Sequence, residues 1–219
     1  MLCKDYQKIV KKVNKNRLMK MSDRIQYAID DASSGKTLSG LMHACFALEG
    51  TGKKLFGDGF SRDLFVKTFN HYLWVIEPMF ACGINLDETL FKNIKLKKRQ
   101  SSFCEILYEV FRCSFAHGYE LPEGFGVELT SDPMHRTLHF EKQSLIIPDT
   151  IIYALCAAVI FSNANADLSI KEGYWLACGT MYFDINKWWG REEDARICFS
   201  TVNILRVTLI LDGMEANYP

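Results

Sequence analysis

The sequence has no net charge and no Cys-x-x-Cys pair, and each absence narrows the range of functions. Its 26 basic residues balance its 26 acidic residues. The chain therefore lacks the overall positive charge of many nucleic-acid-binding proteins, and any contact with RNA must be local. Its 8 cysteines are scattered singly, and no secretory leader precedes them. These features predict a reduced, cytoplasmic protein.

The chain also lacks a hydrophobic run long enough to cross a membrane. Its longest apolar run of note extends from Ile151 to Phe161, which is well short of the ~20 residues that a membrane-spanning helix needs. We therefore expect a buried helix there and no membrane partner. There is no internal repeat, low-complexity segment or interdomain linker. With 219 residues and 48% hydrophobic content, one globular domain with additions is expected.

Hydrophobic periodicity predicts a mainly helical fold. Apolar residues recur at helical spacing in the segments 37–48, 61–76, 102–117 and 149–163. These segments predict an up-and-down helical bundle, in which Pro78 ends the second helix. Short β-type runs within 124–147 are broken by glycine, aspartate and proline. They predict a small hairpin or three-stranded meander inserted in the bundle.

The predicted organisation has three regions. Residues 1–33 form a basic helical arm, docked on the core or on a partner, with a solvated terminal helix as the alternative. Residues 34–165 form the helical domain with its β insertion. Residues 166–219 form a mixed C-terminal extension packed on the same domain. Within the extension, 174–185 has a β-like pattern, and 192–210 has a helical pattern that contains β-branched residues.

The segment from Arg112 to His117 carries the clearest indication of chemistry. Arginine holds phosphate oxygens, and histidine moves a proton near neutral pH. Ser102 and Glu105 predict a capping box at the start of this helix, and Gly118 predicts its left-handed end. His117 then lies in the last turn, where the helix dipole favours the protonated imidazole. The alternative is a surface arginine and a helix-terminal histidine bonded to the last carbonyl groups.

This motif resembles the signature of HEPN domains, because Arg112 is followed five residues later by His117 and then by Gly118. The resemblance extends over about residues 38–161 and implies a metal-independent endoribonuclease. The family usually has Asn, Asp or His directly after the arginine, whereas this chain has Cys113. The departure favours a non-catalytic HEPN-like module that binds RNA or a nucleotide as the alternative.

The resemblance also implies a mechanism and partners. His117 would shuttle a proton as the ribose 2′-hydroxyl attacks the adjacent phosphate, and Arg112 would stabilise the developing charge. No metal or cofactor is required. The two motif helices of a homodimer would build one cleft. The usual roles of members of the resembled family imply a toxin, antiviral or stress function and a cognate antitoxin or inhibitor protein.

Further residues would support this site. Cys113 and Ser114 flank the arginine and could line the same cleft, although a lone cysteine is more often half-buried. The candidate RNA-binding cations just before the helix are Lys95, Lys97, Lys98 and Arg99. Clustered cations attract RNA by counterion release, and a solvated basic loop is the alternative. A protein-interaction scaffold is the remaining alternative, favoured by the neutral charge and the basic arm.

Overall fold

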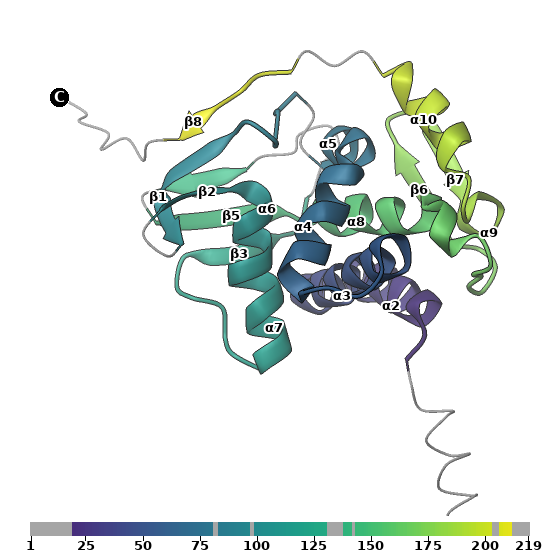
Figure 1. The fold of residues 1–219 in the computed structure, drawn as a ribbon, viewed down its shortest axis with the longest axis horizontal. Coiled ribbons are helices and arrows are strands. Elements are labelled where there is room, and N and C mark those ends of the chain that lie inside the picture. Colours follow the sequence, from purple (N-terminus) through teal and green to yellow (C-terminus); the bar gives the residue numbers. More distant parts are fainter. Residues whose placement is uncertain are drawn as a thin grey trace, which may run out of the picture.

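The structure is a computed structural model that describes residues 19–80, 83–96, 99–130, 138–141, 143–202 and 206–211. It is mainly helical, as predicted, with small sheets at its edges (Figure 1). The α-helices are α2 (Met21–Ser33), α3 (Thr37–Phe56), α4 (Ser61–His71), α5 (Leu73–Phe80), α6 (Phe103–Ile106), α7 (Cys113–His117), α8 (Thr150–Phe161), α9 (Ile185–Trp188) and α10 (Glu192–Ser200). A π-helix, η1 (Leu107–Arg112), and a 3-10 helix, η2 (Asn163–Asn165), complete the set of described helices.

The strands form three small sheets in the described part of the chain. The strands are β1 (Leu90–Leu96), β2 (Arg99–Ser102), β3 (Phe125–Glu128), β4 (His139–Glu141), β5 (Ser144–Pro148), β6 (Trp175–Cys178), β7 (Met181–Asp184) and β8 (Ile210–Leu211). Their orders are β2-β1-β8, β3-β5-β4 and β6-β7. In Figure 1, the first two sheets lie on one side of α8, and the β6-β7 hairpin lies with α9 and α10 on the other.

Helix α8 forms the centre of the core and confirms the helix predicted over 149–163. Nearly all of its side chains are buried, and α2, α3 and α5 pack against it. A helix that is apolar on all sides can be buried on all sides, which accounts for its central position. Among the described helices, none is long and apolar enough to cross a membrane.

Helix α3 continues past the predicted end at residue 48 because its glycines lie where other helices approach closely. A Cβ atom at Gly40 would lie 2.9 Å from the carbonyl oxygen of Ala28 on α2. A Cβ atom at Gly52 would lie 2.8 Å from the carbonyl oxygen of Leu64 on α4. Such distances leave no room for a side chain. Gly52 therefore allows close helix packing, and α3 continues through it to Phe56.

The prediction that Pro78 ends the second helix is wrong. The helix breaks earlier, at Tyr72 between α4 and α5, and Pro78 lies inside α5. Tyr72 is fully buried, and its hydroxyl donates a hydrogen bond to Glu192 at 2.9 Å. The break therefore coincides with a tertiary contact that no local pattern in the sequence reveals.

The predicted β insertion is present, but a simple meander is wrong. Strand β5 lies in the middle of the sheet, parallel to β3 and antiparallel to β4. Leu145 and Ile147 of β5 are completely buried. The most apolar strand therefore takes the central position, where both of its edges are paired.

No strand is predicted in the basic segment before the motif helix, but part of this segment forms a hairpin. Strand β1 pairs antiparallel with β2, and β8 pairs parallel with β1. Phe91 and Ile94 are buried and hold β1 on the core. The polar residues of β1, Lys92, Asn93 and Lys95, obscured this strand pattern in the sequence.

The two ends of the chain differ from the prediction in detail. Residues 1–18 of the basic arm lie outside the described residues, while α2 packs on α3 with Ile25, Ala28 and Ala32 buried. The β-like pattern over 174–185 is confirmed by β6 and β7. The helical pattern over 192–210 is confirmed only for α10, which ends at Ser200.

Candidate functional site

The helix that carries the motif begins and ends as predicted. The Glu105 amide donates to the Ser102 hydroxyl, and the Ser102 amide donates to the Glu105 carboxylate, each at 3.3 Å. Gly118 has a φ of +66° and ends the helix in the left-handed conformation. Between these caps, α6, η1 and α7 follow one another without a break. Local capping chemistry therefore fixes both boundaries.

The middle of this helix is the π-helix η1, which brings Arg112 against α3. The Arg112 guanidinium lies 5.1 Å from the ring centroid of Phe46 and 5.3 Å from that of Tyr108. π-Helical turns are frequent at functional sites, although they are not sufficient to identify one. The geometry gives Arg112 an aromatic environment that the sequence motif does not suggest.

Arg112 is engaged by an acidic partner. Its Nε donates to Glu49 Oε2 at 2.8 Å, and its Nη2 lies 2.6 Å from the same oxygen. Only 13% of its side chain is exposed. Burial opposes the positive charge, but the Glu49 carboxylate outweighs burial and raises the pKa of Arg112. The predicted catalytic arginine is thus already neutralised.

His117 lies apart from Arg112. Its side chain is exposed, and its ring stacks on that of Tyr119, with centroids 5.6 Å apart. No hydrogen bond or ion pair joins His117 to Arg112 within the part of the chain that the structure describes. Residues five apart on an α-helix are rotated by roughly 140°, which accounts for the separation.

The two supporting residues beside Arg112 are buried or half-buried, and their place in a cleft stays a prediction. Cys113 is half-buried, and burial, followed by the nearby Glu109 carboxylate, raises the pKa of its thiol. Its thiol is therefore a weak nucleophile, because the thiolate is the reactive form. Ser114 is buried, with 8% exposure.

Two of the four predicted RNA-binding cations lie in the strands of the hairpin before the motif helix. Lys95 lies in β1 and Arg99 lies in β2. Lys97 and Lys98 lie outside the described residues. Their role in RNA binding stays a prediction.

A second arginine, which the sequence reasoning missed, lies against the same phenyl ring. Helix α2 places the Arg24 guanidinium 5.0 Å from the centroid of Phe46. The Arg24 guanidinium has no hydrogen bond or ion pair with any residue that the structure describes. Burial lowers its pKa, and the Glu49 carboxylate only partly offsets burial. We call this group the Phe46 face, made of Arg24, Phe46, Glu49, Tyr108 and Arg112.

Two further side chains border the Phe46 face. His43 Nε2 lies 3.9 Å from Asp31 Oδ2, and the buried His43 Nδ1 has no partner among the described residues. Burial first, and then Arg24, lower the pKa of His43. Tyr27 packs on the imidazole with ring centroids 5.5 Å apart, and 44% of Tyr27 is exposed. His43 thus lies close to Arg24, and the exposed Tyr27 ring packs on His43 at the border of the face.

The sequence indicates only some of the contacts that form the Phe46 face. Phe46 and Glu49 are three residues apart on one helix, so they share a side of α3. Arg24 belongs to the predicted arm, and nothing local places it near Arg112. Only the packing of α2 on α3 brings the residues together.

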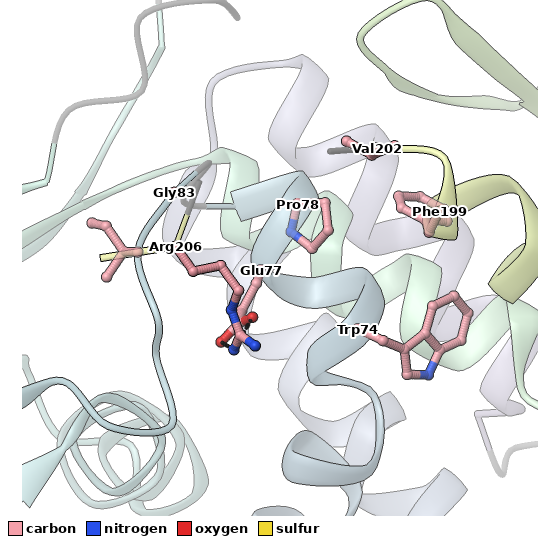
Figure 2. Close-up of a pocket in the computed structure, with 8 residues that line it drawn as sticks. Trp74, Glu77, Pro78, Gly83, Phe199, Val202 and Arg206 are labelled. Atoms are coloured by element: carbon pink, nitrogen blue, oxygen red, sulfur yellow. Dashed lines mark hydrogen bonds and ion pairs between the residues drawn. The ribbon is translucent and has the colours of Figure 1, made fainter. Parts of the chain in front are cut away.

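A cavity lies elsewhere, between α5 and the chain that follows α10 (Figure 2). It has a volume of about 180 Å³ and is lined by Trp74, Glu77, Pro78, Gly83, Ile84, Phe199, Val202 and Arg206. Figure 2 shows Trp74 and Pro78 facing Phe199 and Val202, with the Glu77 and Arg206 pair at another side. The described residues contain no group of three His, Cys, Asp or Glu side chains arranged to hold a metal.

Comparisons with known proteins point to one family. The profile of the family Rv1289 matches residues 20–214. The uncharacterized proteins Rv1289 of Mycobacterium tuberculosis (strain H37Rv) and Mb1320 of Mycobacterium bovis are each 24% identical over 174 residues, which cover 78% of this chain and 81% of theirs. No solved structure matches the chain.

These matches correct the HEPN assignment, which is wrong. The Rv1289 profile covers most of the chain, and no HEPN family matches. The short motif was misleading for a physical reason. A cation in the last turn and a glycine just after it are what any helix C-terminus favours.

Proposed function

Since the chain belongs to the Rv1289 family, whose relatives carry no assigned activity, we propose a function from the side chains themselves: binding of single-stranded RNA at the Phe46 face. The observation that carries this proposal is the guanidinium of Arg24, which has no counter-ion among the residues that the structure describes. It lies half-buried over Phe46, while the nearby carboxylate of Glu49 is engaged by Arg112.

The charges and rings of this face suit an RNA phosphate and base. A partly desolvated cation without a counter-ion is unfavourable, so an anion from a ligand would stabilise it. Arginine binds phosphate oxygens through a planar fork of N–H groups. The exposed ring of Tyr27, which borders the face through His43, offers a surface on which a base can stack.

The geometry favours binding over cleavage. Arg112 would have to leave Glu49 before it could stabilise a transition state, and the exposed His117 makes no contact with it among the described residues. The endoribonuclease scheme therefore stays a prediction. So do the homodimer and the inhibitor protein.

The proposal is tested by the fluorescence anisotropy of a short labelled single-stranded RNA with the full chain in EDTA. Arg24→Gln is expected to weaken binding by about tenfold, because one charge-assisted contact is lost. The matched control is Arg191→Gln, which removes an exposed arginine paired with Asp194 on α10. No binding by the wild type, or equal losses in both variants, would contradict the proposal.

The same samples test cleavage. RNA products are separated on a denaturing gel after incubation with the wild type and with His117→Ala. Cleavage that disappears in His117→Ala would revive the endoribonuclease prediction. Binding with intact RNA supports the binding function alone.

A further inference from the structure

We propose that the cavity between α5 and the chain that follows α10 binds a small, neutral, single-ring aromatic molecule that carries one oxygen acceptor. This site is separate from the Phe46 face and does not depend on RNA binding. Three features carry the proposal: the size of the cavity, its apolar walls, and a guanidinium of which two nitrogens have no hydrogen-bond partner among the described residues.

The size of the cavity selects a ligand of one ring. Its volume is about 180 Å³. An engineered apolar cavity of roughly 150 Å³ in another protein binds benzene. The present cavity therefore has room for one aromatic ring and a short substituent.

The walls favour an aromatic ligand. The Trp74 and Phe199 rings meet edge to face, with centroids 5.8 Å apart. The Arg196 guanidinium lies 4.5 Å from the Trp74 ring centroid and helps to hold that indole in place. Pro78, Ile84 and Val202 supply the remaining apolar lining. Aromatic rings pack well against such surfaces in edge-to-face or offset arrangements.

The polar side of the cavity explains why the ligand should carry an oxygen acceptor. Arg206 Nη2 donates to Glu77 Oε1 at 2.8 Å and to Asn85 Oδ1 at 3.1 Å. Arg206 Nε and Nη1 have no hydrogen-bond partner within the described ranges. A guanidinium has five N–H donors, so these nitrogens remain able to bind a ligand oxygen.

The charge balance explains why the ligand should be neutral. Glu77 is buried, and it accepts hydrogen bonds from Arg206 and from the Leu86 amide, the latter at 2.9 Å. Its carboxylate already compensates the Arg206 guanidinium, with Oε2 2.7 Å from Nη2. A ligand carboxylate would lie near that of Glu77 and be repelled by it. A carbonyl or hydroxyl oxygen would accept from Arg206 without this repulsion.

The test compares three probes of nearly the same shape by isothermal titration calorimetry with the full chain. The probes are acetophenone, α-methylstyrene, in which a CH2 group replaces the carbonyl oxygen, and benzoate. Acetophenone is expected to bind about tenfold more tightly than α-methylstyrene, because only its oxygen can accept from Arg206. Benzoate is expected to bind most weakly. Equal affinities for the first two probes, or tightest binding of benzoate, would overturn the proposal.

Variants locate the binding site. Val202→Trp should fill the cavity and abolish binding, whereas Ile197→Trp on the exposed side of α10 should not. Arg206→Lys keeps a cation for Glu77 but removes the free Nε and Nη1 donors, so acetophenone should bind only as well as α-methylstyrene. Nuclear Overhauser effects from acetophenone to the Trp74 indole are expected in the wild type. Their absence would overturn the proposal even if Val202→Trp did not fold.

Discussion

Two charge clusters in this molecule differ in how completely their charges are paired. At the first, Glu192 is buried and accepts hydrogen bonds from the Tyr72 hydroxyl and from Arg196, each at 2.9 Å. His71 Nε2 lies 3.3 Å from the same carboxylate. At the second, the Phe46 face, Glu49 pairs with Arg112 and leaves Arg24 without a partner among the described residues.

This difference separates a structural cluster from a candidate ligand site. The Glu192 cluster joins α10 to the junction of α4 and α5, and its carboxylate is satisfied by groups from both regions. Complete pairing stabilises the fold and leaves no charge for a ligand. The Phe46 face carries an excess positive charge that is half-buried, so an anion can still be bound there. Substitutions should therefore change stability alone at the Glu192 cluster, whereas at the Phe46 face they should also change RNA binding.

The largest effect is expected for Glu192→Ala. The substitution leaves the buried Tyr72 hydroxyl and the partly buried Arg196 without their acceptor. The free energy of unfolding should fall by about 3 kcal/mol, and RNA binding by the folded protein should not change. Urea denaturation followed by circular dichroism measures the stability. Glu193→Ala, at an exposed position in the same helical turn, is the control and should change stability by less than about 0.5 kcal/mol.

Glu49→Gln should give a smaller loss of stability and a gain in binding. Arg112 loses its charged partner, so the free energy of unfolding should fall by about 2 kcal/mol. Removal of the carboxylate leaves both guanidinium groups near Phe46 available for phosphate, and RNA affinity should rise about fivefold. Anisotropy titrations measure the affinity, with the exposed Glu120→Gln as the control for net charge. Weaker RNA binding by Glu49→Gln would place the RNA site elsewhere.

The features predicted well from the sequence depend on short-range interactions. The capping box at Ser102, the left-handed Gly118 and the buried run of α8 are each determined by neighbouring residues, and the structure confirms them. The helix break at Tyr72 and the β1-β2 hairpin were missed because they coincide with contacts to distant parts of the chain.

The candidate site was predicted only in part for the same reason. Arg112 stood out through its motif, but its partner Glu49 is 63 residues away and Arg24 lies on another helix. Sequence spacing on one helix says nothing about which carboxylate neutralises an arginine. The motif therefore identified a helix end correctly and did not identify the unpaired cation.

The smallest expected effect is on the pH dependence of stability. This measurement distinguishes the two clusters without the use of RNA. Burial alone would raise the pKa of Glu192, but the hydrogen bonds from Arg196 and Tyr72 outweigh burial, and the pKa is lowered. Because the folded pKa lies below the unfolded value of roughly 4.3, the carboxylate contributes stability above that pH. This contribution is lost as the pH falls through the folded pKa. Urea denaturation between neutral and acidic pH should show a fall in the free energy of unfolding that is shallower in Glu192→Gln. An equal pH dependence in the wild type and Glu192→Gln would show that Glu192 is not held as a buried, paired carboxylate, and the contrast between the clusters would fail.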